Sequence, residues 1–109
     1  MEKEKEKVKV YGHTPLKRPI PTGNCPGCHY GLITRAVGEV LDEMGVGGQV
    51  IGVCGVGCCF GFFAQLNVDA INCAHGCAPA VATGIKHAHF GKPIVITVQG
   101  DGDCASIGA

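Results

Sequence analysis

The sequence has no tryptophan and little charge: 17% of its 109 residues are charged, and the formal net charge is zero. A protein that binds nucleic acid must neutralise many phosphates with lysine and arginine. The composition therefore argues against a nucleic-acid partner. Because 46% of the residues are hydrophobic, it favours a buried, globular piece of a protein.

Residues 1–9 lack the apolar segment of a secretory signal peptide, and glutamate and lysine alternate there instead. We therefore expect a reducing compartment, the cytoplasm. The chain has eight cysteines, which would indicate a disulfide scaffold in a secreted protein. In a reducing compartment they are more often metal ligands or small core residues.

Residues 46–68 carry no charge and are long enough to span a bilayer, which takes about 20 residues. Gly52, Gly55, Gly57 and Gly61 interrupt this stretch at intervals typical of loops. It also lacks basic flanks and a belt of tryptophan and tyrosine. The stretch predicts a buried strand followed by a glycine loop, and no membrane partner.

Composition divides the chain in two. Residues 1–23 predict a charged tail and an extended, proline-rich lead-in, and residues 24–109 predict the front part of a domain. The clearest helix in that domain follows Cys28 and ends at Gly45. Five apolar residues fall on one of its faces at helical spacing: Ile33, Val37, Val40, Leu41 and Met44.

Short β-branched runs predict strands at 49–53 and 94–98, with a shorter strand possible at 70–73. A second helix is predicted from about 78 to 89, with a proline tolerated in its first turn. The order of helices and strands predicts an α/β fold with an open, mostly parallel sheet and flanking helices.

Ligands of such sheets bind at the carboxyl ends of the strands. The loop 54–59, the pair 75–76 and the segment 100–103 each follow a predicted strand. We therefore expect these three segments to face one crevice.

Gly100-Asp101-Gly102 has the outline of a diphosphate site. Glycines let the backbone approach an anion, and a carboxylate is a hard oxygen ligand for Mg²⁺. An isolated Gly-Asp-Gly is also a common turn at the end of a strand.

Cys25-Pro26-Gly27-Cys28 stands immediately before a helix, where two thiolates can reach one metal centre or one corner of a cluster. Zinc is the alternative, with Cys73 and Cys77 as a loose second pair. A thioredoxin-like redox pair is disfavoured because no strand directly precedes it.

Together these residues resemble a known family, the thiamine-diphosphate-binding β subunits of 2-oxoacid:ferredoxin oxidoreductases. The resemblance covers about residues 24–109. It is carried by Asn24-Cys25-Pro26-Gly27-Cys28, Gly55-Val56-Gly57-Cys58, His75-Gly76, the run 80–86, and Gly100-Asp101-Gly102-Asp103 with Ile107-Gly108, in the order and close to the spacing of the family.

The resemblance implies a partial thiamine-diphosphate-binding fold. It assigns Cys25, Cys28 and Cys58 as ligands of a 4Fe-4S cluster, with a fourth cysteine beyond residue 109, and Asp101 as a ligand of Mg²⁺. The residues that it places around thiamine diphosphate are Gly57, Cys58, His75, Gly100, Asp101, Gly102 and Asp103.

The activity that the resemblance implies is oxidative decarboxylation of a 2-oxoacid to an acyl-coenzyme A, with electrons passed through the cluster to ferredoxin. It also implies an α subunit that carries the pyrimidine-binding half of the cofactor site. We therefore expect residues 1–109 alone to be catalytically inert. Two alternatives stay open: a non-catalytic zinc or iron-sulfur module, and a cluster-free thiamine-dependent decarboxylase subunit.

The sequence departs from the family at three places. His29 follows Cys28 directly, where the family often has a glycine between the second cysteine and the histidine. Cys77 replaces a common arginine, and Cys59 a frequent serine. We interpret Cys59 as a small pocket residue and not as a further ligand. Cys54, Cys73 and Cys104 are predicted to be small buried residues, because free cysteine is among the most buried residue types.

Overall fold

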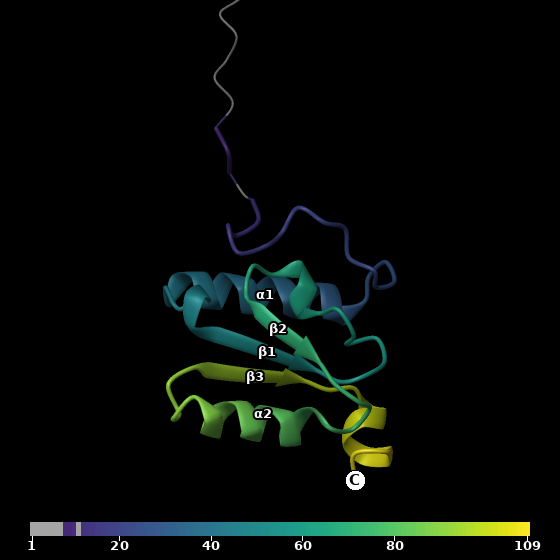
Figure 1. The fold of residues 1–109 in the computed structure, drawn as a ribbon. Helices are drawn as coiled ribbons and strands as arrows, with labels where there is room; N and C mark the ends of the chain where they lie inside the picture. Colours follow the sequence, from purple (N-terminus) through teal and green to yellow (C-terminus); the bar gives the residue numbers. More distant parts are fainter. Residues whose placement is uncertain (1–7, 11) are drawn as a thin grey trace, which may run out of the picture.

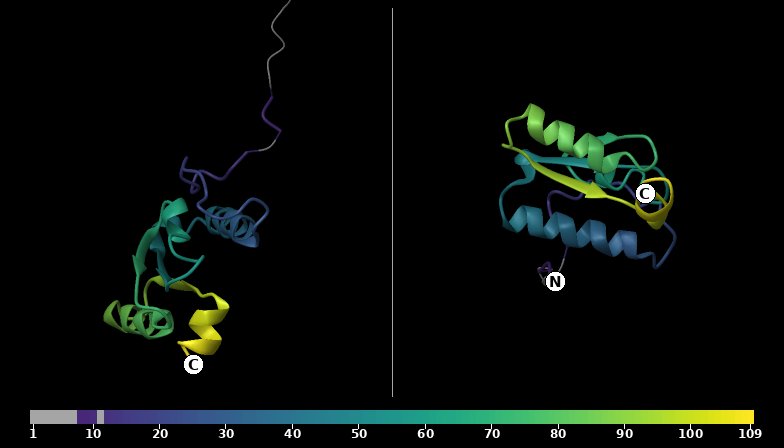
Figure 2. Two further views of the ribbon diagram at one scale, coloured as in Figure 1. Left: turned by 90° about the vertical axis from the view of Figure 1, so that its right-hand side faces the viewer. Right: turned by 90° about the horizontal axis from the view of Figure 1, so that it is seen from below.

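The structure is a computed structural model that describes residues 8–10 and 12–109. Three parallel strands form one sheet in the order β2-β1-β3: β1 (Val50–Cys54), β2 (Asp69–Asn72) and β3 (Ile94–Val98). Helix α1 (His29–Glu43) and helix α2 (Ala78–Ala88) lie on opposite sides of this sheet, as Figures 1 and 2 show. The predicted α/β fold with an open parallel sheet and flanking helices is confirmed.

Three short helices complete the described elements: η1 (Gly47–Gln49), η2 (Phe63–Gln65) and η3 (Gly102–Ser106). The uncharged stretch 46–68 forms η1, β1 and η2. Among the described residues, no helix combines the length and the apolar character that a membrane crossing requires.

The core lies beside the central strand β1. Cys54, Phe62, Phe63 and Leu66 form a buried cluster. Gly52 brings the Phe63 ring onto the strand, because a Cβ atom at Gly52 would lie 2.2 Å from the ring carbon Cγ. The loop after β1 therefore folds back over the strand and seals it.

Helix α1 begins where the cysteine motif ends, with Cys28 at its N-cap. Gly45 follows the helix at a φ of 66°, a left-handed conformation that favours glycine, as predicted from the sequence. The second helix also agrees with prediction, with its proline in the first turn.

The predicted apolar face of α1 is only partly buried. Leu41 is 5% exposed, but Ile33, Val40 and Met44 are 45%, 52% and 60% exposed. The face that meets the core is instead centred on Thr34, Gly38 and Leu41.

Gly38 explains this orientation. A Cβ atom there would lie 3.0 Å from Leu66 and 3.1 Å from Thr14, so a glycine lets the helix approach closely on this side. Helical periodicity predicted an apolar stripe, but the close approach at a glycine selects which side of the helix packs.

The lead-in has no helix or strand of its own in its described part. It pairs with the segment after η2 through a single antiparallel bridge between Lys17 and Leu66. The Arg18 amide donates to the Gln65 carbonyl at 2.8 Å, and the Asn67 amide donates to the Leu16 carbonyl at 2.7 Å. The predicted charged tail falls mostly in residues 1–7, outside the described residues, and the division between residues 1–23 and 24–109 stays a prediction.

Candidate functional site

The register of the sheet brings three strand ends together. Cys54, the last residue of β1, pairs with Asn72 of β2 and with Val98 of β3. The loop after β1, the turn at 75–76 and the segment 100–103 therefore leave the sheet at the same edge, as predicted.

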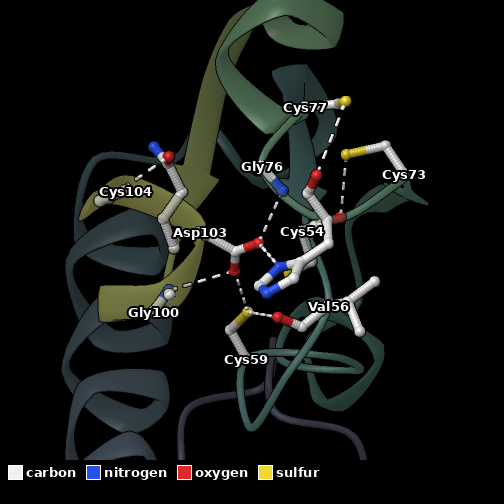
Figure 3. A network of polar contacts seen from close by, with 12 residues as sticks. Cys54, Val56, Cys59, Cys73, Gly76, Cys77, Gly100, Asp103 and Cys104 are labelled. Carbon is white, nitrogen blue, oxygen red and sulfur yellow. Dashed lines mark hydrogen bonds and ion pairs between the residues drawn. The ribbon is translucent and has the colours of Figure 1, made fainter. Parts of the chain in front are cut away.

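Asp103 joins these three segments. It is 1% exposed, and its Oδ1 accepts a hydrogen bond from the Gly76 amide at 2.9 Å and another from His75 Nδ1. Figure 3 shows the carboxylate at the centre of this network. The Asp103 carboxylate lies in η3, after the last strand, and thus holds the turn that follows β2.

The other carboxylate oxygen reaches the remaining segments. Asp103 Oδ2 accepts from the Gly100 amide at 3.3 Å and contacts Cys59 Sγ at 3.4 Å (Figure 3). Space for the carboxylate depends on Gly55, where a Cβ atom would lie 2.5 Å from Asp103 Oδ1. All three loops therefore contact the buried side chain of Asp103.

These contacts keep Asp103 ionised. The hydrogen bond from the Gly76 amide contributes most to holding the pKa of Asp103 well below its ordinary value. Burial acts in the opposite direction, but His75, Cys59 and the Gly100 amide add to the lowering. The buried charge is thus balanced by donors from the surrounding loops.

His75 lies at the surface of this network. Its side chain is 32% exposed, whereas that of Asp103 is 0% exposed. The ring flanks Gly102, because a Cβ atom at Gly102 would lie 3.5 Å from both Cε1 and Nε2 of His75. The predicted cofactor residues His75 and Gly102 are therefore neighbours.

Asp101 differs from Asp103 in being exposed. It is the N-cap of η3, and its Oδ1 accepts a hydrogen bond from the Gly102 amide at 2.9 Å. Within the described part of the chain, Oδ2 has no hydrogen-bond partner. The Gly-Asp-Gly segment thus leads from the end of β3 into η3 and leaves one carboxylate oxygen of Asp101 available to a cation.

The three thiols predicted to bind a cluster share one cavity. Cys25, Cys28 and Cys58 all line a hollow of about 410 Å³ between the lead-in and the loop after β1. Asn24 fixes the two parts of this cavity to each other, since its Nδ2 donates to the Cys58 carbonyl at 3.0 Å. Asp101 does not line this cavity.

The spacing of the thiols does not fit a single metal ion. No three His, Cys, Asp or Glu side chains among the described residues lie close enough to bind a single metal ion. A four-iron cluster takes one thiolate at each of several corners, so its ligands surround a space and do not meet at a point. Thiols spaced around one cavity therefore fit the ligand arrangement of a cluster.

Tyr30 is a residue of the site that the sequence did not reveal. Its hydroxyl lies 3.7 Å from the place of a Cβ atom at Gly100. Burial raises the pKa of Tyr30, and the neighbouring Cys59, Cys58, Asp103 and Cys28 add to that effect. Tyr30 therefore stands between the thiol cavity and the Asp103 network, on the first turn of α1.

The remaining cysteines follow the predictions in part. Cys54 is buried as predicted. Cys59, which we interpret as a small pocket residue, is also buried and contacts Asp103. The prediction that Cys104 is buried is wrong: it lies exposed on η3, with its Sγ 3.4 Å from Gln99 Oε1. Cys73 is only half-buried, because β2 is an exposed edge strand.

An open parallel sheet with flanking helices and with its loops gathered at the carboxyl ends of the strands defines the α/β class of fold, in which ligands bind at this edge. No family model matches the chain. It is nevertheless 40% identical over 90 residues to the ketoisovalerate oxidoreductase subunit VorA of Methanothermobacter marburgensis. It is 35% identical over 90 residues to the 2-oxoglutarate synthase subunit KorB of Methanocaldococcus jannaschii.

The structure agrees with the sequence comparisons. The 2-oxoglutarate:ferredoxin oxidoreductase from Magnetococcus marinus, solved with 2-oxoglutarate, coenzyme A and succinyl-CoA bound, matches with a TM-score of 0.79 and 33% identity over 85% of this chain. The resemblance seen in the sequence is therefore confirmed: the chain is homologous to part of the β subunits of 2-oxoacid:ferredoxin oxidoreductases.

The match covers most of this chain but little of its relatives. The aligned region is 83% of the chain and 19% of VorA, and 82% of the chain and 33% of KorB. In the solved oxidoreductase it is 32% of the matched chain. The similarity thus concerns one portion of a longer subunit.

Proposed function

We propose that this chain is a portion of the β subunit of a 2-oxoacid:ferredoxin oxidoreductase in the cytoplasm. The complete enzyme would oxidatively decarboxylate a 2-oxoacid to an acyl-coenzyme A and pass the electrons through a 4Fe-4S cluster to ferredoxin. The observation that carries the proposal is the cavity lined by Cys25, Cys28 and Cys58 beside the strand-end site. The homology to enzyme subunits of this class supports it.

The three thiols fit a cluster chemically. Cys25 and Cys28 close a tight turn, in which the Cys28 amide donates to the Cys25 carbonyl at 3.0 Å and Gly27 has a φ of 77°. Cys28 also occupies the N-cap position at the start of α1. Cys58 would be the third ligand, and a fourth cysteine is expected outside residues 1–109.

The strand-end site fits a diphosphate held through Mg²⁺. The exposed Asp101 would supply a carboxylate oxygen to the ion. Gly100 and Gly102 leave room above the turn, and His75 would form one wall of the pocket. Gly57, Cys58 and Asp103 complete the residues that we assign to cofactor binding.

Thiamine diphosphate, when bound, supplies the electron sink that a 2-oxoacid needs in order to lose carbon dioxide. This chain's own share is placement: Asp101 anchors the charged end, His75 and Gly102 shape the pocket, and the thiol cavity lies on the other side of Tyr30. The proposed partners are an α subunit with the pyrimidine-binding half, ferredoxin, coenzyme A and the 2-oxoacid.

The test is an anaerobic assay of the full-length, assembled protein with a panel of 2-oxoacids, coenzyme A and oxidised ferredoxin. We expect ferredoxin reduction that requires both coenzyme A and one class of 2-oxoacid. Decarboxylation without ferredoxin reduction would instead support the cluster-free decarboxylase. A protein that contains zinc and reduces nothing would support the non-catalytic module.

A further inference from the structure

Asp103 stands next to the proposed cofactor site but has no open path to it. We propose that Asp103 is a positioning residue, which holds the His75 ring with Nδ1 as the hydrogen-bond donor and with Nε2 turned toward Gly102. The identity of the ligand near Nε2 rests on the proposed function. The orientation of the ring rests on the geometry of this chain alone.

Burial argues for an indirect role. The Asp103 side chain is 0% exposed, and each of its oxygens has two partners within the protein. A direct ligand of Mg²⁺ needs an accessible oxygen, and Asp101 has one. We therefore infer that Asp103 contributes to cofactor binding indirectly, by holding His75, and that His75 makes the contact with the ligand.

The other partners of the carboxylate decide which nitrogen of His75 carries the proton. Backbone amides of Gly76 and Gly100 can only donate, so both oxygens of Asp103 act as acceptors. Because each oxygen already accepts from an amide, the carboxylate acts toward His75 as an acceptor as well, and the contact is made by Nδ1–H.

In the neutral ring, this tautomer leaves Nε2 with a lone pair. The Nε2 atom lies 3.5 Å from the place that a Cβ atom would take at Gly102, so the absence of a side chain there keeps this edge of the ring open. Within the described residues Nε2 has no hydrogen-bond partner. It is suited to accept a hydrogen bond from a donor at the turn, such as water on a cation held by Asp101.

The backbone segments around Asp103 and His75 pack closely against each other. A Cβ atom at Gly108 would lie 1.6 Å from the Asp103 carbonyl oxygen, and one at Gly76 would lie 2.8 Å from Gly108 Cα. Gly76 itself has a φ of 79°, which favours glycine. The turn that carries His75 and Gly76 thus meets the segment around Gly108 backbone to backbone.

The test uses full-length protein labelled with ¹⁵N in histidine and measured by NMR without added cofactor. His75→Gln assigns the signals of His75 by their loss. At alkaline pH, where the ring is neutral, we expect a protonated Nδ1 and an unprotonated Nε2 in the wild type. Asp103→Ala should shift the ring toward the Nε2–H tautomer that free imidazole side chains prefer, and Asp103→Asn, which keeps an acceptor oxygen, should retain Nδ1–H.

Cys59→Ser is the matched control, since Cys59 contacts the same carboxylate but not His75; it should leave the tautomer unchanged. A protonated Nε2 in the wild type would overturn the proposal even if Asp103→Ala does not fold. The same tautomer in a folded Asp103→Ala protein would overturn it as well.

Calorimetric titration with thiamine diphosphate and Mg²⁺ separates this inference from the proposed function. We expect Asp103→Ala to weaken binding about 10- to 100-fold, as loss of a supporting residue behind a ligand does. The same loss in His75→Gln, with no further loss in the double variant, is the expected result, and additive losses would contradict it. If the wild-type protein has Nδ1–H but binds no cofactor, the proposed function is contradicted and the inferred orientation of the His75 ring is not.

Discussion

Asn24 and Cys58 are 34 positions apart in the chain, yet Asn24 Nδ2 donates to the Cys58 carbonyl at 3.0 Å. This bond joins the loop that carries Cys25 and Cys28 to the loop that carries Cys58. Thr22 in turn contacts Asn24 through its hydroxyl, which accepts from the Asn24 amide at 3.1 Å. The geometry of the proposed cluster site therefore depends on a side chain that is not itself a ligand.

Replacing Asn24 with alanine should weaken the cluster site without removing a thiol. A hydrogen bond of this kind contributes about 0.5–1.5 kcal/mol, so we expect iron to be lost to a chelator about 2- to 10-fold faster. Thr83→Ala is the control, because the Thr83 hydroxyl donates to the Pro79 carbonyl within α2 and Thr83 does not line the thiol cavity. Equal rates in the wild type and Asn24→Ala would contradict the role given to this bond.

Replacing single cysteines with serine should distinguish the cysteines that bind the cluster from those that do not. We predict that serine at position 25, 28 or 58 abolishes most of the iron bound by anaerobically purified protein. Cys104→Ser should keep the wild-type iron content, since Cys104 is exposed on η3, away from the thiol cavity. Iron and sulfide analysis of the four variants checks this, and retention of a full cluster in Cys58→Ser would count against the assignment.

A methyl group at position 52 should destabilise the fold. Its Cβ would lie 2.2 Å from the buried ring of Phe63, and overpacking of this kind costs about 1–3 kcal/mol. Gly48→Ala is the matched control, because nothing lies within 4 Å of a Cβ atom there. Urea unfolding should show a lower midpoint for Gly52→Ala only. Equal midpoints for both variants would show that the ring adjusts freely.

The Cys54 thiol should stay protonated at pH values where an exposed thiol ionises. Burial raises the pKa of Cys54 above its ordinary value of 9.0. Iodoacetamide should therefore modify Cys25 of the cluster-free protein much faster than Cys54, as mass spectrometry of digested protein can measure. Similar rates at both positions would contradict the burial of Cys54.

The raised pKa of Cys54 also predicts how the free energy of unfolding changes at alkaline pH. Below pH 9.0 the thiol is protonated in both states, so it contributes no pH dependence. Above that value the unfolded chain loses the proton first, and the free energy of unfolding falls as pH rises toward the raised pKa. Cys54→Ala should show a shallower decline between pH 9 and 10, and an unchanged slope would contradict this account.

Much of the fold followed from local patterns. The strand Ile94–Val98 has the predicted bounds, because a β-branched run between a proline and a glycine leaves little choice. The register of three parallel strands then brings their carboxyl ends together. The gathering of the loops at one edge could therefore be predicted without any side-chain detail.

The rest required tertiary contacts that leave no pattern in the sequence. Asp101 and Asp103 stand two positions apart and look alike in the sequence, but one is exposed and the other is buried by amide donors from distant loops. Backbone donors are the same for every residue type, so they could not be foreseen. Gly38 likewise turned the packed side of α1 away from Ile33, Val40 and Met44.

We propose above all that thiols of this chain hold an electron-carrying cluster beside a thiamine diphosphate site. The most direct measurement is the visible spectrum of the anaerobic, full-length assembled protein before and after addition of 2-oxoacid and coenzyme A. We predict iron-sulfur absorbance that bleaches when both are present and is absent from the Cys58→Ser protein. A colourless wild-type protein, or a spectrum that substrate does not change, would contradict the claim.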